Sequence, residues 1–130
     1  MELVLDASVI GRWFGPSRDA QSATVRTDFE AGRLVIVVPR LLFLELLNVA
    51  GRQRRWAETQ LLGLVSRLVE ARFEVVEPDL RRVAAWTARG LTTYDATYVA
   101  LAEERGIPLV TNDREILRIA GEVARPVSPR

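Results

Sequence analysis

Short apolar runs alternate along the chain with longer segments in which apolar residues return every three or four positions. Four of these runs are rich in Val, Leu and Ile, and they predict buried strands at residues 3–5, 34–38, 73–76 and 107–111. A short tail, Pro126, Val127 and Ser128, predicts one more strand at the edge of the sheet. The chain therefore carries the hydrophobic pattern of a five-stranded sheet.

The longer segments predict helices at residues 18–31, 40–51, 56–71, 79–89, 92–105 and 114–120. Pro39 precedes the second of them and Gly106 follows the fifth, and both residues suit those positions. Strands that alternate with helices predict a mostly parallel sheet with helices on both faces, in one domain of residues 1–130. Ligands of such folds bind beyond the carboxyl ends of the strands, so functional residues are expected there.

The composition narrows the chemistry. The chain has no cysteine and no histidine, which excludes thiolate nucleophiles, the usual zinc sites and Ser-His-Asp catalysis. The net charge of +1 favours no class of partner, and the use of arginine for every basic residue is more typical of compositional bias than of nucleic-acid binding. No targeting segment or run of membrane-spanning length is visible, so we expect a soluble, cytoplasmic protein without a membrane partner.

Two carboxylates follow predicted strands, at the edge where ligands are expected. Asp6 ends the first strand, and Asp113 follows the fourth. Each could equally cap the helix that comes next, since aspartate is a preferred N-cap residue. Ser8 could cap in place of Asp6 or hold a metal-bound water. Glu115 is interpreted as a solvated acid in a first helical turn.

Two more carboxylates stand in predicted helices. Glu45 shares one face with Asn48 in a segment that is otherwise apolar, which predicts a buried helix. A buried carboxylate must be paired, bind a metal or be protonated, and a salt bridge to arginine is the structural alternative. Asp95 follows Thr92 at the spacing of a capping box, yet a carboxylate in the first turn can cap and still face a cleft.

These four acids are weak signals singly, but the expected fold brings them toward one edge. Four neighbouring carboxylates repel one another and raise one another's pKa values, and a divalent cation removes that cost. Oxygen ligands select hard ions, so Mg²⁺ or Mn²⁺ is the predicted cofactor. A metal-bound water could then be the nucleophile, which would make histidine unnecessary.

Four segments resemble the motifs of PIN domains, in the order that the family has. Residues 6–10 are similar to the opening motif, residues 39–48 to the second, residues 94–103 to the third and residues 108–113 to the fourth. The resemblance spans nearly the whole chain and favours the VapC toxin branch. It implies an α/β/α sandwich and a Mg²⁺- or Mn²⁺-dependent endoribonuclease that cuts RNA, usually as a homodimer, and is inhibited by a cognate antitoxin protein.

Position within these motifs also implies roles for individual residues. The acidic quartet, both catalytic and metal-binding, would be Asp6, Glu45, Asp95 and Asp113. Supporting polar groups would be Ser8, Asn48 and Thr111.

Arginines that stand beside tryptophans, or beside the fourth acid, are candidates for contact with RNA. Such pairs suit a single strand or a loop, because arginine binds phosphate and an aromatic ring stacks on a base. The candidates are Arg12 beside Trp13, Arg52, Arg54 and Arg55 beside Trp56, and Arg114 with Arg118 after Asp113. The alternative is a solvated arginine turn next to core tryptophans.

Other functions use strand-end acids too. A phosphatase of the Asp-x-Asp type would lack its second acid, because position 8 is Ser, and a phospho-receiver domain would lack its usual lysine. A P-loop NTPase is excluded because no GxxxxGK[ST] is present. The remaining alternative is a non-catalytic PIN-like module that binds nucleic acid or serves in assembly.

Overall fold

The computed structural model describes residues 1–14 and 20–127, with side chains throughout except at residues 20–22. Its sheet has the strand order β3-β2-β1-β4-β5, and every neighbouring pair is parallel. The strands are β1 (Glu2–Leu5), β2 (Val35–Val38), β3 (Glu74–Val75), β4 (Leu109–Val110) and β5 (Ala124–Arg125). The predicted parallel sheet is confirmed, with β1 at its centre.

The last strand is not where the sequence predicts it. β5 ends at Arg125, just before the predicted residues 126–128, of which the last lies outside the described residues. Leu109 N donates to Val123 O at 3.1 Å and Thr111 N donates to Arg125 O at 3.1 Å. Pro126 has no backbone N–H, so the ladder stops before it.

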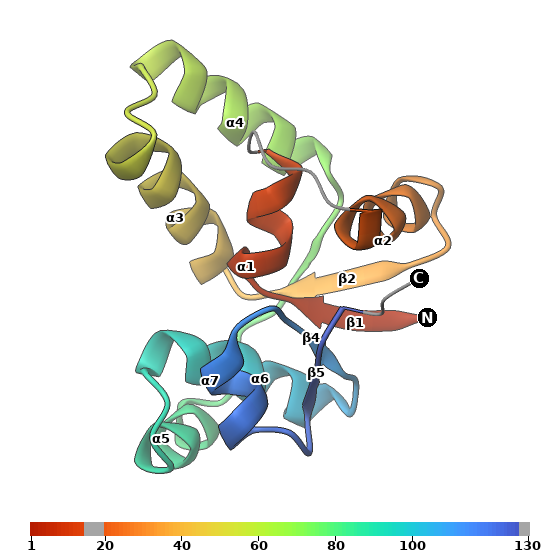
Figure 1. Cartoon of the computed structure of the whole chain (residues 1–130), viewed down its shortest axis with the longest axis vertical. Coiled ribbons are helices and arrows are strands. Elements are labelled where there is room, and N and C mark those ends of the chain that lie inside the picture. The colour runs from red at the N-terminus through yellow and green to blue at the C-terminus, as the bar shows by residue number, and fades with distance from the viewer. Residues whose placement is uncertain (15–19, 128–130) are drawn as a thin grey trace.

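Helices cover both faces of the sheet, which confirms the predicted α/β/α sandwich (Figure 1). One layer holds α1 (Ala7–Ile10), α2 (Ala20–Glu30), α3 (Leu41–Asn48) and α4 (Glu58–Glu70), and the other holds α5 (Leu80–Ala88), α6 (Thr93–Arg105) and α7 (Arg114–Ile119). The start of the predicted helix at 18–31 lies partly outside the described residues. α1 and the 3₁₀ turn Gly11–Trp13 were not predicted, because such short helices leave no periodicity to detect.

Two parts of the upper layer in Figure 1 differ from the sequence-based expectation. α3 is not buried all round: it lies at the outside of the layer, and Leu44 is 55% exposed. Its last turn continues as a π-helical turn, Val49–Gln53. Trp13 is only 8% exposed and stacks on Phe29 and Phe73 at centroid distances of 5.9 and 6.5 Å. Trp13 is therefore a core residue, which is the alternative that the sequence left open beside stacking on RNA bases.

α6 is the most buried helix of the other layer. Ala96 and residues 98–102 are all buried, and the helix packs against β1, β4 and α5. It begins at the carboxyl edge of the sheet and ends at Gly106, which adopts the left-handed conformation (φ 67°) that glycine tolerates. None of the helices in the described residues is long and apolar enough to cross a membrane.

Candidate active site

Asp6 is fixed where β1 passes into α1, and it caps that helix as the structural alternative predicts. Its Oδ1 accepts from the Ser8 backbone N at 3.2 Å and from Ser8 Oγ at 2.5 Å. Its Oδ2 accepts from Thr111 Oγ1 at 2.5 Å. The residue is only 5% exposed. Both carboxylate oxygens are therefore held by hydroxyl donors, one from its own segment and one from the end of β4.

The segment after β4 locks onto the same network. Asn112 N donates to Ser8 Oγ at 3.0 Å, and Asp113 N donates to Thr111 Oγ1 at 3.0 Å. Each hydroxyl thus gives its single proton to Asp6 and receives a backbone N–H. Asp113 caps α7, because its Oδ1 accepts from Ile116 N at 3.0 Å. β1 and β4 are neighbours where the chain crosses from one side of the sheet to the other, the usual place for a ligand site in this architecture.

Glu45 and Asp95 approach this centre from helices of opposite layers. Glu45, on α3, is partly buried, and its Oε1 accepts from the hydroxyl of Tyr98 on α6. A phenol therefore takes the place of the arginine that the structural alternative expected. Asp95 lies in the first turn of α6, where its backbone N donates to Thr92 Oγ1 at 3.1 Å. Asp95 is also partly buried, so its carboxylate can serve the site while Thr92 caps the helix.

The electrostatics tie the four acids together. Burial raises the pKa of Asp6 above its usual value, and the charge of Asp113 adds to the rise against the hydrogen bonds from the hydroxyls. Burial is also the main cause of the raised pKa of Glu45. The hydrogen bond from Tyr98 lowers this pKa, and the charges of Asp95 and Asp6 raise it. The pKa of Asp95 is raised by burial and then by the charges of Asp113 and Asp6. Among the described residues, the charges that shift these three pKa values are those of other acids.

The four acids are neighbours but do not form a preformed metal-binding site among the described residues. Among the described residues, no three acidic side chains lie close enough to hold a metal ion together. Four anions repel one another, and hydrogen bonds fix Asp6, Asp113 and Glu45 to separate partners. Residues from four places in the sequence therefore converge on one edge as charged neighbours rather than as a closed cluster.

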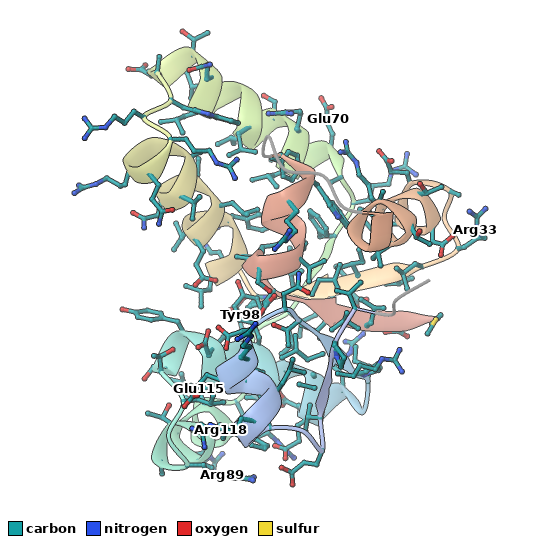
Figure 2. All side chains as sticks on the ribbon, viewed as in Figure 1. Arg33, Glu70, Arg89, Tyr98, Glu115 and Arg118 are labelled. Carbon is teal, nitrogen blue, oxygen red and sulfur yellow. The ribbon has the colours of Figure 1, made fainter. Side chains whose placement is uncertain are left out.

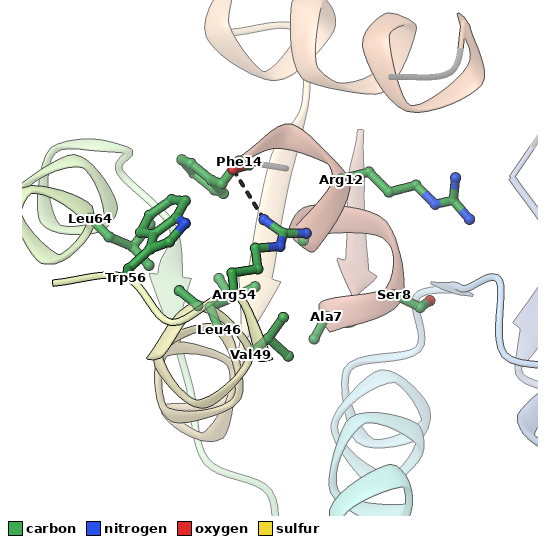
Figure 3. Close-up of a pocket in the computed structure, with 11 residues that line it drawn as sticks. Ala7, Ser8, Arg12, Phe14, Leu46, Val49, Arg54, Trp56 and Leu64 are labelled. Carbon is green, nitrogen blue, oxygen red and sulfur yellow. Dashed lines mark hydrogen bonds between the residues drawn. The ribbon is translucent and has the colours of Figure 1, made fainter. Parts of the chain in front are cut away.

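Two of the basic candidates line a pocket, and all of the basic candidates are exposed. Arg54 Nη1 donates to Phe14 O at 3.2 Å, inside a pocket of about 290 Å³ that Ser8 also lines (Figure 3). Arg12 lines the same pocket, with its guanidinium directed away from Arg54 in Figure 3. Trp56 borders this pocket and is partly buried. Arg12 and Arg54 are exposed, as are the candidates outside the pocket: Asn48, Arg52, Arg55 and Arg114.

Two charged side chains of α7 pair with each other. Arg118 donates to Glu115, and both are exposed (Figure 2). The pKa of Glu115 is lowered by this hydrogen bond, opposite to the direction found for the three buried acids. Glu115 is thus a solvated acid of the first turn, as interpreted from the sequence, and Arg118 is held beside it.

Tyr98 is the contact that sequence reasoning missed. It lies between the two helical layers (Figure 2), is 1% exposed, and reaches Glu45 across 53 positions of sequence. Burial raises its pKa, and the neighbouring Glu45 raises it further, so the phenol stays protonated as a donor. The available signal was its spacing from Asp95, since residues three apart share a helix face.

Comparisons with known proteins bear on the family. The model of the PIN domain matches residues 3–122. Exonuclease VapC9 from Pyrobaculum aerophilum is 49% identical over 49 residues, which are 35% of this chain and 35% of that protein. The match therefore spans about a third of the relative's length.

Two solved structures share the fold. VapBC2 from Rickettsia felis, bound to a DNA fragment from their promoter, has a TM-score of 0.73 at 14% identity, over 98% of this chain and 100% of that one. Mycobacterium tuberculosis VapC20, a Sarcin-Ricin loop cleaving toxin, has a TM-score of 0.64 at 20% identity, over 89% and 93%. Because the family model covers most of its length, the chain belongs to the PIN domain family, as its four motifs predict.

Proposed function

We propose that this protein is a divalent-metal-dependent endoribonuclease that acts as the toxin of a toxin–antitoxin pair. The observation that carries the proposal is the set of four carboxylates at the carboxyl edge of the sheet: the pKa values of Asp6, Glu45 and Asp95 are raised by burial and by the charges of neighbouring acids, Asp113 among them. Maintaining neighbouring anions costs stability, and a structural network would pair them with arginine instead. The cost is understandable if the acids serve a ligand.

The donor set fits Mg²⁺ or Mn²⁺. All four groups offer oxygen ligands, and their net negative charge lacks compensation within the group, which suits a hard divalent cation. Asp6, Glu45, Asp95 and Asp113 would hold the ion. A bound ion would supply an activated water and a counter-charge for the phosphodiester. Ser8 and Thr111 would keep Asp6 in place through their hydroxyls, and Asn48 would act from the face of α3 that carries Glu45.

RNA as the substrate is supported by the exposed arginines and by the relatives. Arg52, Arg55 and Arg114 are free to reach solvent, while Arg12 and Arg54 border the pocket beside Ser8. Cleavage within an RNA chain, as opposed to removal of end nucleotides, is supported by the likeness to VapC20, which is described as a Sarcin-Ricin loop cleaving toxin. The name of VapC9 favours a second candidate, an exonuclease that removes nucleotides from an end.

The proposed partners are a cognate antitoxin and a second copy of the chain, with the whole system in the cytoplasm, where its RNA substrate is. An antitoxin is supported by the likeness to VapBC2, which binds the DNA of its own promoter. A homodimer is supported by α4, whose outer face carries exposed Leu62, Val65 and Val69 at helical spacing.

The test is cleavage of structured RNA by partner-free protein, in EDTA and after Mn²⁺ or Mg²⁺ is restored. Asp6→Asn and Asp95→Asn would be compared with Asp79→Asn, a matched control because Asp79 caps α5 at a distance from the site. Asparagine caps a helix as well as aspartate does, so the control removes one negative charge outside the proposed site and keeps the helix cap. We expect metal-dependent cutting that is lost in the first two variants and kept in the third.

A circular RNA separates the two modes of cutting. Circular RNA has no ends, so an endonuclease cuts it and an exonuclease leaves it intact. Absence of cutting on both linear and circular RNA by folded, metal-bound protein would favour the non-catalytic binding or assembly module. Cutting that survives both Asp6→Asn and Asp95→Asn would refute the site assignment.

A further inference from the structure

Glu45 is held differently from the other acids of the site. Asp6 is gripped at both oxygens by neighbouring hydroxyls, and Asp113 is fixed as a helix cap. Glu45 has a longer side chain with three rotatable bonds, and the hydrogen bond described for its carboxylate is to the Tyr98 hydroxyl. Its orientation therefore depends on a group from another helix layer.

Tyr98 is well suited to fix that orientation. Its ring is fully buried among the residues of α6 that face the sheet, so the hydroxyl cannot move far from Glu45. A phenol has one proton to donate, and here it goes to Oε1. The second oxygen of Glu45 is then left for another partner, on a carboxylate whose charge neighbours are Asp95 and Asp6.

We propose that Tyr98 is a positioning residue, which holds Glu45 by one oxygen so that the other is available to the proposed divalent ion. The inference rests on the proposed metal-dependent function. Outer groups that orient a ligand commonly change metal affinity by about 10- to 100-fold when they are removed. A tyrosine retained only for core packing would have no such effect when its hydroxyl alone is removed.

The experiment measures Mn²⁺ binding to the full chain without RNA, by isothermal titration calorimetry. Tyr98→Phe removes the hydroxyl and keeps the ring, and Tyr94→Phe is the matched control on the same helix, where the side chain is 62% exposed. We expect Tyr98→Phe to weaken Mn²⁺ binding by about tenfold and Tyr94→Phe to leave it unchanged. Circular dichroism and thermal unfolding verify that both variants fold.

A double-mutant cycle with Glu45→Gln shows whether Tyr98 acts through Glu45. We expect the loss from Tyr98→Phe to shrink to less than about twofold once Glu45 is already Gln, because the two changes remove one interaction. In metal-free protein, proton NMR should show a protected Tyr98 hydroxyl signal that changes in Glu45→Gln.

Three results would overturn the inference in distinguishable ways. Equal Mn²⁺ affinity in the native protein and Tyr98→Phe would refute the positioning role alone. Independent losses from Tyr98→Phe and Glu45→Gln would show that Tyr98 does not act through Glu45. No Mn²⁺ binding by the native protein would refute the metal-dependent function, and the inference with it.

Discussion

Acidic side chains have opposite charged neighbours at the two edges of the sheet. At the amino edge, Glu2 of β1 and Glu74 of β3 both accept from Arg105 Nη2, each at 3.1 Å. At the carboxyl edge, Asp6, Glu45 and Asp95 have other acids as their charged neighbours, and their pKa values are raised by burial and by that proximity. α6 connects the edges, with Asp95 in its first turn and Arg105 in its last.

We interpret the difference as one between acids that serve the fold and acids that we propose serve a ligand. A carboxylate paired with arginine is already compensated and offers little to a cation. Carboxylates gathered without such compensation destabilise the folded chain until something positive binds. The carboxyl edge is therefore the one where function is expected, and the predictions below test that contrast.

The largest expected effect is on cleavage. Asp95→Asn and Asp113→Asn should each lower the rate of RNA cleavage by about a hundredfold or more, because metal-held charge contributes several kcal/mol to such reactions. Glu74→Gln at the amino edge should leave the rate within about twofold, since one acid of an ion pair far from the site contributes no metal ligand. Single-turnover assays with saturating Mn²⁺ measure both. Comparable losses at the two edges would remove the contrast.

The next effect is on stability, and it depends on pH and metal. Folded Asp6, Glu45 and Asp95 have pKa values above the usual 3.8 and 4.5, so the folded chain binds more protons than the unfolded chain in the range above those values. The free energy of unfolding of metal-free protein should therefore fall as pH rises through the raised pKa values and then level off.

Metal should reverse that loss. Near neutral pH, Mn²⁺ at a hundred times its Kd should add about 2.7 kcal/mol to the free energy of unfolding. Urea titrations in EDTA across pH, and again with Mn²⁺, measure both parts. A free energy that rises with pH in EDTA over this range would contradict the assignment of these acids as uncompensated.

A third prediction concerns the hydroxyl that holds Asp6. Thr111→Val keeps the shape of a fully buried side chain but leaves Asp6 Oδ2 without its donor and Asp113 N without its acceptor, so it should cost about 1–3 kcal/mol. Thr97→Val is the matched control, because the Thr97 hydroxyl donates to the backbone O of Thr93 within its own helix, at 2.8 Å, and not to an acid of the site. Urea unfolding compares them, and equal losses would mean that the Asp6 contact is not special.

The smallest expected effect lies at the paired edge. Arg105→Gln should lower the melting temperature only slightly, because all three charged side chains are half-exposed and the pairs are screened by solvent. The difference from native protein should shrink further in high salt. Cleavage should be unaffected. A large loss of stability would show that the amino edge matters more to the fold than its exposure implies.

Local sequence pattern predicted much of this molecule. The apolar runs located β1 to β4 to within two residues at either end, and the helical periodicities located α3 to α7, because side-chain period and end signals are properties of neighbouring residues. The ends of strands also gave Asp6 and Asp113, and Thr92 with Asp95 gave the start of α6. The prediction of β5 failed because its signal was short, and the burial of Trp13, which the sequence left open, was decided by packing.

The class of fold and the family could be predicted from the sequence alone, and a chain without histidine or cysteine leaves carboxylates and hydroxyls as the candidate functional groups. Only the tertiary structure decided that β1 lies between β2 and β4, that Thr111 reaches Asp6, and that Tyr98 holds Glu45. The two side-chain contacts join residues that are 105 and 53 positions apart in the sequence. Their partners are selected by strand order and helix packing, which no local periodicity records.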